Sequence, residues 1–187
     1  MQSDILFHTD LNNFSFTVYS HTPDFDFIEL QQIHGIKCVE PINLEEADGF
    51  IFEDLTTPLC IKTADCLPII IETAQTNAFI HAGWRGLNNG ILKQDSIKSL
   101  TNKKVFIGPH IRDCCFEVGE EFLDYFDHGI KRKNKKLYLA LEEVVRKDLP
   151  DAQILSCDIC TCCHKEFNSY RRDKTKQRNH NILHPIN

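Results

Sequence analysis

The stretch that decides the fold is Cys66–Gly86, "CLPIIIETAQTNAFIHAGWRG". Its two short apolar runs are rich in β-branched and aromatic residues and flank a polar break, which predicts two antiparallel strands. A four-residue loop at 73–76 would place Pro68 opposite His81. Cys66 then lies diagonally across from His81 on the same face, because the side chains of one face recur at every second position. The spacing therefore allows a shared site in this register.

The turn that follows, "GWRG" at 83–86, favours a binding role. Gly83 allows close approach of the backbone, and Arg85 offers a forked donor for phosphate or carboxylate. Asp65 stands beside Cys66 and could orient a histidine or accept a proton. The alternative is an ordinary buried hairpin that contains a core cysteine and a core histidine.

A third candidate ligand lies upstream in "QQIHGIKC" (31–38), where His34 precedes a glycine inside an otherwise apolar stretch. This break predicts that the His34 imidazole is displayed. Two histidines and a cysteine make a three-point site for zinc or copper, with a fourth position open for water or substrate.

The ordered sequence blocks resemble those of the laccase-domain family, also called multicopper polyphenol oxidoreductase-like or purine nucleoside phosphorylase proteins, with bacterial peptidoglycan editing factors among them. The resemblance runs from about Gln31 to Arg178. It rests on "QQIHG" (31–35), "TADCLP" (63–68), "HAGWRG" (81–86), "IGPHIRDCCFEVGEE" (107–121) and "FNSYRRDKTKQR" (167–178).

The resemblance implies one α+β domain over residues 1–187. Its mixed β-sheets would pack between helices in α/β/β/α layers, similar to the catalytic domain of a bacterial deamidating toxin. It implies a zinc or copper ion at His34, Cys66 and His81. It also implies phosphorolysis of adenosine, inosine and methylthioadenosine, deamination of adenosine, and a possible link to peptidoglycan precursor editing.

Site roles follow from the residues and the resemblance together. Asp65, Cys66 and Arg85 are expected to be catalytic. Substrate binding is expected from Gly83, Trp84, Arg85, Glu117 and Arg171. For Glu117 the alternative is a carboxylate that begins a helix, and for Arg171 it is a surface ion-pair network.

Nine cysteines in a chain that we expect to be cytoplasmic indicate reduced thiols, some of them metal ligands. "CDICTCCH" (157–164) could hold a second structural metal through Cys157 and Cys160, although no second CxxC lies at the expected distance. Cys114 and Cys115 are expected near the pocket, and as adjacent thiols they are not expected to chelate together.

Composition limits the partners. The net charge of −6 argues against broad nucleic-acid binding, and the basic run Lys131–Lys136 predicts a solvated loop. No apolar run approaches the roughly 20 residues of a membrane span. We expect a monomer or homodimer that binds a purine nucleoside and phosphate. The competing functions are a copper polyphenol oxidoreductase and a metal-free thiol hydrolase with Cys66 as nucleophile and His81 as base.

Periodicity and turn residues give a coarse map of the elements, with Asp48-Gly49 as a turn. Strands are expected at 5–8, 14–19, 27–33, 36–39, 67–71, 78–81, 104–107 and 153–156, and helices at 86–100, 117–126 and 137–149.

Overall fold

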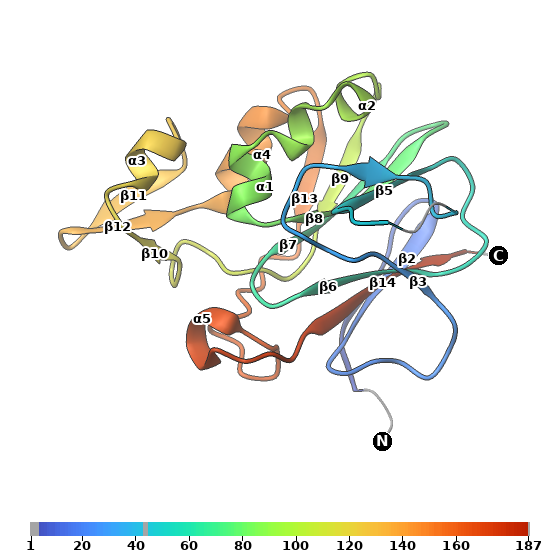
Figure 1. The fold of residues 1–187 in the computed structure, drawn as a ribbon, viewed down its shortest axis with the longest axis horizontal. Coiled ribbons are helices and arrows are strands. Elements are labelled where there is room, and N and C mark those ends of the chain that lie inside the picture. Colours follow the sequence, from blue (N-terminus) through green and yellow to red (C-terminus); the bar gives the residue numbers. More distant parts are fainter. Residues whose placement is uncertain (1–3, 43–44, 187) are drawn as a thin grey trace.

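The computed structural model describes residues 4–42 and 45–186, which form three β-sheets and several short helices (Figure 1). The six-stranded sheet runs in the order β13 (Gln153–Ser156), β9 (Lys104–Ile107), β7 (Leu67–Glu72), β8 (Asn77–Ala82), β5 (Gly49–Phe52) and β4 (Cys38–Val39). The five-stranded sheet runs in the order β1 (Ile5–Asp10), β2 (Phe14–Tyr19), β14 (Asn179–Pro185), β6 (Leu59–Thr63) and β3 (Ile28–Glu29).

A small third sheet, with the order β10 (Glu117–Val118), β12 (Lys136–Leu139) and β11 (Ile130–Lys133), projects away from the other two beside helix α3 (Phe122–Tyr125). The other helices are α1 (Trp84–Asn88), the 3-10 turn η1 (Ile91–Lys93), α2 (Asp95–Lys98), α4 (Leu141–Asp148) and α5 (Tyr170–Asp173). Among the described residues, no helix has the length and apolar character needed to span a membrane.

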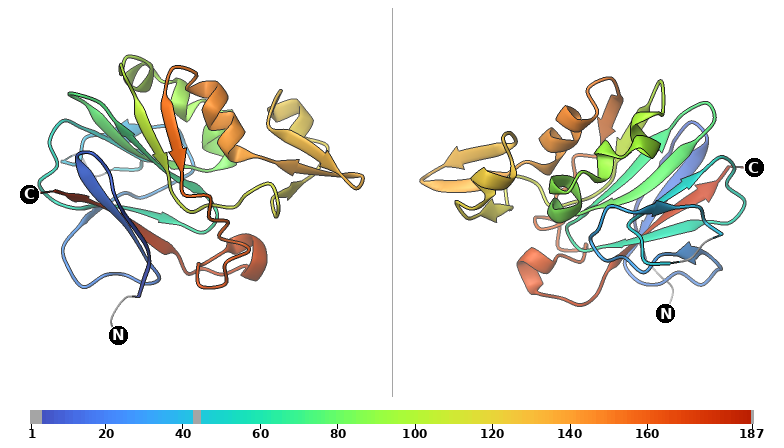
Figure 2. Two further views of the ribbon diagram at one scale, coloured as in Figure 1. Left: turned by 180° about the vertical axis from the view of Figure 1, so that it is seen from behind. Right: turned by 45° about the horizontal axis from the view of Figure 1, so that its top comes forward.

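Strand β7 serves two hydrophobic cores because its side chains alternate between the faces of the sheet. Ile69 and Ile71 pack toward the helices, in a cluster that includes Leu87 and Val144. Ile70 points the other way, into an aromatic cluster between the two large sheets. The layers are therefore helix, six-stranded sheet and five-stranded sheet, with α1, α2 and α4 on one face of the six-stranded sheet (Figure 2).

The α+β class with mixed sheets is confirmed, since parallel pairs such as β9–β13 and β3–β6 stand beside antiparallel ones. The outer face of the five-stranded sheet carries aromatic contacts from the irregular segment after β2. There the Phe25 ring packs against Tyr19 and His184.

The predicted register of the β7–β8 hairpin is confirmed, with Leu67 paired to Ala82 and Pro68 to His81. The strands predicted at 14–19, 104–107 and 153–156 match β2, β9 and β13 residue for residue. These segments are apolar, short and bounded by turn residues, so the local pattern was sufficient.

The predicted helices were too long. The helix expected at 86–100 is divided into α1, η1 and α2, because Gly90 adopts a left-handed φ of 88° and interrupts the helix. The helix expected at 117–126 is β10 followed by α3. The helix expected at 137–149 begins only at Leu141, since Leu137 and Leu139 belong to β12.

The basic run Lys131–Lys136 is a hairpin rather than a loop. Asn134 and Lys135 form its two-residue turn, both with positive φ, as in a type I′ turn. Lys131 and Lys133 each bind Asp113, at 3.0 and 3.2 Å from Nζ to Oδ2, so the run is locally neutralised.

Strands predicted at 27–33 and 36–39 shrink to β3 and β4, which lie in different sheets. The chain between them crosses from one sheet to the other and carries His34 in the crossing. The predicted turn at Asp48-Gly49 was wrong, because Gly49 begins β5 and Asp48 is fully buried. β6 and β14 were not predicted at all.

Candidate functional site

His34, Cys66 and His81 meet where two crossings between the large sheets reach the end of β8. Their potential donor atoms all lie within 4.8 Å of one another. His34 Nε2 is 3.8 Å from Cys66 Sγ, and the His34 and His81 rings approach edge to face with centroids 4.8 Å apart. The hairpin register supplies Cys66 and His81, and the crossing between β3 and β4 supplies His34.

Asp48 organises this site, and the sequence did not indicate it. Its Oδ1 lies 2.8 Å from His81 Nδ1, which leaves His81 Nε2 free for a ligand on the side of Cys66. Asp48 also accepts backbone N–H groups from Ile33, His34 and Gly35, at 3.3, 2.9 and 2.6 Å. One buried carboxylate therefore orients one histidine and holds the backbone of the other, as outer partners of metal ligands do.

The electrostatics of the three side chains favour a thiolate. Burial raises the pKa of Cys66, but the facing imidazoles of His81 and His34 outweigh burial and lower that pKa to about 6. For His81, burial lowers the pKa, whereas the Cys66 thiolate and Asp48 raise it to about 9. Burial likewise raises the pKa of Asp48, but hydrogen bonds from His81 and from backbone N–H groups bring it below its ordinary value.

The donor set fits a tetrahedral metal ion. Zinc with one thiolate and two imidazoles holds neighbouring S and N donors about 3.6 Å apart, given bond lengths of about 2.3 and 2.0–2.1 Å. The separation of 3.8 Å between Cys66 Sγ and His34 Nε2 is close to that value. His34 has a left-handed φ of 61°, a strained conformation of the kind that persists where surrounding contacts impose it.

Gly83 allows the site to close. A Cβ at this position would lie 3.1 Å from both Cys66 Sγ and His34 Cδ2. A Cβ at Gly86 would lie 3.0 Å from the carbonyl oxygen of Gly35, which follows His34. Both glycines of "GWRG" therefore allow the segment that carries His34 and Gly35 to pack closely against the start of α1.

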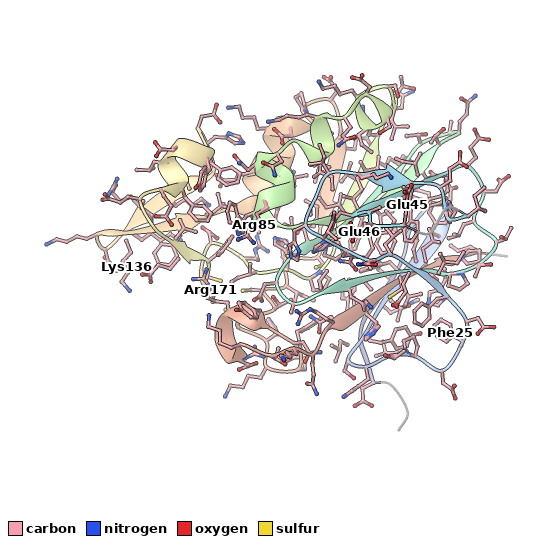
Figure 3. The ribbon with its side chains drawn as sticks, viewed as in Figure 1. Phe25, Glu45, Glu46, Arg85, Lys136 and Arg171 are labelled. Atoms are coloured by element: carbon pink, nitrogen blue, oxygen red, sulfur yellow. The ribbon has the colours of Figure 1, made fainter. Side chains whose placement is uncertain are left out.

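The site lies in the wall of a cavity of about 1280 Å³. Arg85 from α1 and Arg171 from α5 both line this cavity and are labelled in Figure 3. The cationic side chains in the lining are Lys62, Arg85, Arg171, Lys174, Lys176 and Arg178. The cavity therefore suits an anionic ligand beside the metal-binding residues.

Trp84 and Arg85 form one unit in the cavity lining. The guanidinium carbon of Arg85 lies 4.7 Å from the Trp84 ring centre, and that ring stacks on Tyr125 at 5.7 Å between centroids. Arg85 is exposed and lines the cavity, so its donors are accessible to a ligand. The cation–π contact restricts where this guanidinium can lie.

Asp65 and Arg171 are linked. Asp65 Oδ2 accepts the backbone N–H of Arg171 at 2.6 Å, and its Oδ1 accepts Thr161 Oγ1–H at 2.8 Å. The Arg171 guanidinium donates to the carbonyl oxygen of Glu117 at 2.7 Å and lies over the Phe116 ring. Both oxygens of Asp65 therefore accept hydrogen bonds from the loops around the cavity. The carboxylate that orients a histidine is Asp48.

The Glu117 carboxylate pairs with Lys136 at 2.8 Å on the small third sheet, and Arg171 contacts the main-chain carbonyl of Glu117 instead. In "CDICTCCH", Cys157 packs near the aromatic core between the sheets. Cys160 instead lies with Cys163 and with Cys114 and Cys115.

Comparison with known proteins agrees with the fold and the motifs. A family model described as multi-copper polyphenol oxidoreductase laccase matches residues 12–182. A purine nucleoside phosphorylase of Aquifex aeolicus is 36% identical over 159 residues, covering 79% of this chain and 77% of that protein. Purine nucleoside phosphorylase YfiH of Escherichia coli K12 is 34% identical over 175 residues, covering 80% and 70%.

Two solved structures share the architecture. Neisseria meningitidis protein NMB0706 superposes with a TM-score of 0.82 at 20% identity, over 100% of both chains. YlmD from Geobacillus stearothermophilus gives 0.74 at 25% identity, over 86% of this chain and 74% of that one. Together with the sequence matches, these similarities show that the chain belongs to the multi-copper polyphenol oxidoreductase laccase family.

Proposed function

We propose that this chain is a metal-dependent purine nucleoside phosphorylase. The observation that carries the proposal is the convergence of His34, Cys66 and His81 at the wall of a cavity lined by six cationic side chains. Phosphorolysis needs a nucleoside and an inorganic phosphate in one site, and such a cavity suits the phosphate. The names of the Aquifex aeolicus and Escherichia coli relatives support the same activity.

Zinc is the proposed ion, with copper as the alternative, and His34, Cys66 and His81 would hold it. A zinc ion bound there would act as a Lewis acid and could activate water. Asp48 occupies His81 Nδ1, so Nε2 is the nitrogen that would bind the ion. Gly83 leaves space for Cys66 and His34 to approach each other.

The remaining side chains bind and orient the substrates. Arg85, steadied by Trp84, and Arg171, steadied by the carbonyl oxygen of Glu117, provide forked donors for phosphate oxygens. Asp65 acts as a positioning residue, because both of its oxygens accept hydrogen bonds from the loops that carry Thr161 and Arg171.

Turnover of inosine tests the main proposal. The purified chain should release hypoxanthine from inosine only when phosphate is present, and Cys66→Ala should reduce that rate about 100-fold or more, since a metal ligand is lost. Cys157→Ser should leave the rate unchanged, because Cys157 packs against the aromatic core between the two large sheets. Phosphate-independent release, or full activity in Cys66→Ala, would contradict the proposal.

The phosphate KM tests the role of Arg85. Arg85→Ala should raise it about tenfold, which corresponds to roughly 1.4 kcal/mol of lost binding. Arg132→Ala, which removes an exposed arginine from β11, should leave it unchanged. An increase below about twofold would remove Arg85 from the phosphate site.

Adenosine deamination and a link to peptidoglycan precursor editing extend the proposal. Release of ammonia from adenosine without phosphate would support the deaminase activity, and inosine as the sole product would identify C6 as the position attacked. We further propose one domain over residues 1–187, acting as a monomer or homodimer in the cytoplasm. This is supported by β7, which joins both cores, and by cysteines that are all free thiols.

A thiol hydrolase is the second candidate, and one observation favours it. Without metal, Cys66, His81 and Asp48 stand in the order of a nucleophile, a base and an orienting carboxylate. Iodoacetamide should then alkylate Cys66 in metal-free protein and in protein as purified alike. Protection of Cys66 by zinc, together with phosphorolysis by the zinc form, favours the phosphorylase.

A copper polyphenol oxidoreductase is the third candidate, and it rests on the family description and on donors that copper shares with zinc. Copper-loaded protein that oxidises a phenol, with no phosphate-dependent release of purine, would support it.

A further inference from the structure

Four thiols form a second cluster of potential metal donors, separate from His34, Cys66 and His81. Cys114 and Cys115 lie in the turn before β10, and Cys160 and Cys163 lie in the loop between β13 and α5. Their four Sγ atoms are all within 4.8 Å of one another. Cys163 Sγ lies 3.6 Å from Cys114 Sγ and 3.3 Å from Cys115 Sγ.

This arrangement corrects two expectations drawn from the sequence. The adjacent Cys114 and Cys115 were not expected to contribute to one site, yet a tight turn, closed by the N–H of Cys115 donating to the carbonyl of Arg112, brings both thiols to the same place. The CxxC whose two thiols both join this cluster is Cys160 and Cys163, whereas Cys157 packs against the core between the sheets.

The spacing matches a single tetrahedral ion. Four thiolates bound to zinc at about 2.3 Å stand about 3.8 Å apart. A multi-iron cluster lies between its thiolates and spreads them further, whereas here every pair is within 4.8 Å. Because Cys163 contacts two thiols at similar distances, no single pairing into a disulfide is singled out.

Backbone contacts hold both loops in place around the thiols. His110 and Cys160 form a parallel bridge, in which the N–H of Thr161 donates to the carbonyl of His110 at 3.0 Å. The N–H of Arg112 points at Cys160 Sγ at 3.4 Å. Arg172, on α5, donates to four carbonyl oxygens of the second loop, those of Thr161, Cys162, His164 and Phe167.

We propose that Cys114, Cys115, Cys160 and Cys163 bind one structural zinc ion, separate from the ion at His34, Cys66 and His81. The ion would tie the turn before β10 to the loop before α5. That loop supplies Thr161, and α5 supplies Arg171, the two donors that hold Asp65. Zinc at the four thiols would therefore fix one side of the cavity without contacting substrate.

The test counts zinc in a background that lacks the first site. The full chain carrying Cys66→Ala, expressed and purified with zinc, should contain about one zinc per chain by elemental analysis. Adding Cys163→Ser, an exposed position, should lower this to about 0.2 or less, since structural zinc is held by four protein ligands and one of them is then lost. Adding Cys157→Ser instead should leave the content at about one.

A second measurement does not depend on how the Cys163→Ser variant folds. Cobalt added to the metal-free wild-type chain should give an intense thiolate-to-cobalt absorption band, and that band should persist in Cys66→Ala. A Cys66→Ala chain without zinc, or with four fewer titratable thiols after unfolding because disulfides have formed, would overturn the proposal. So would a zinc content unaffected by Cys163→Ser.

Discussion

At the scale of single residues, Asp48 and Gly83 determine how tightly the metal donors can be held. Asp48 is fully buried and accepts hydrogen bonds from His81 and from the backbone on either side of His34. A Cβ at Gly83 would lie 3.1 Å from Cys66 Sγ and from His34 Cδ2, closer than an ordinary contact. Neither residue is a proposed metal ligand. Each affects metal binding by positioning His34, Cys66 or His81.

Replacement of Asp48 by Asn should weaken zinc binding about 10–100-fold, because the amide is a poorer acceptor for the His81 N–H and carries no charge. Competition with a chelator of known affinity measures the change. Glu46→Gln is the matched control, since Glu46 is an exposed carboxylate two residues away. Equal affinities in Asp48→Asn and wild type would show that Asp48 does not support the site.

Replacement of Gly83 by Ala should destabilise the chain by about 1–3 kcal/mol, as overpacking does, and should also lower zinc affinity. The added Cβ would lie 3.1 Å from two of the donor side chains. Denaturant unfolding with and without zinc separates the two effects. Asn88→Ala, on the exposed face of the same helix α1, should change neither quantity.

At the scale of elements, the hairpins show what local sequence specifies. The β7–β8 register followed from loop length and alternation, because one face of this pair must be buried in each core. β14 could not be found this way, since its buried side chains include Asn179, His180 and Asn181. The Asn181 amide donates to two partners distant in sequence, the carbonyl oxygen of Ile61 and the hydroxyl of Thr63, besides the carbonyl of Asn179.

The candidate site divides in the same manner. Cys66 and His81 could be placed from their own hairpin, and His34 from the glycine that follows it. The role of Asp48 could not be predicted, because "DG" is a common turn dipeptide. The burial of Asp48 depends on the pairing of β5 with β8, two strands that are distant in sequence. The thiol cluster was missed for a similar reason, because about 45 residues separate its two halves.

The β11–β12 turn offers a prediction at this scale. Lys135 has a φ of 65°, which costs a residue with a Cβ about 1 kcal/mol. Lys135→Gly would create the Asn-Gly pair favoured in type I′ turns and should raise the free energy of unfolding by up to about 1 kcal/mol. Lys135→Ala removes the same charge but keeps the strain, so it should bring no gain in denaturant unfolding.

At the scale of the whole molecule, positive charge is concentrated around the cavity. The chain carries a net charge of −6, yet six cationic side chains line the cavity. His180 on β14 is buried among them, with Lys62, Glu29 and His21 nearby and Thr22 at 3.2 Å from its Nε2. Its Nδ1 has no hydrogen-bond partner in the part of the chain that the structure describes.

Burial, reinforced by Lys62, lowers the pKa of His180 below its ordinary value. The unfolded chain therefore binds the proton more readily, and stability should be full above about pH 6.5 and decline as the pH falls below it. His180→Gln should reduce this decline between pH 7.5 and 5, measured by denaturant unfolding. His110 and His184, whose pKa values are also lowered by burial, stay in both proteins and cancel in the comparison. Identical pH slopes would contradict the assignment.

The three metal donors of the first site lie on backbone segments of different stability. This difference should determine how fast zinc is exchanged. Cys66 directly precedes β7, and His81 lies in β8. Both are central strands, so their amides should exchange with solvent only when the whole molecule unfolds. His34 lies on an exposed irregular crossing, so opening of residues 32–37 alone would release one donor of three. Transfer of zinc to a chelator should therefore keep pace with the hydrogen exchange of that crossing and run far ahead of global unfolding.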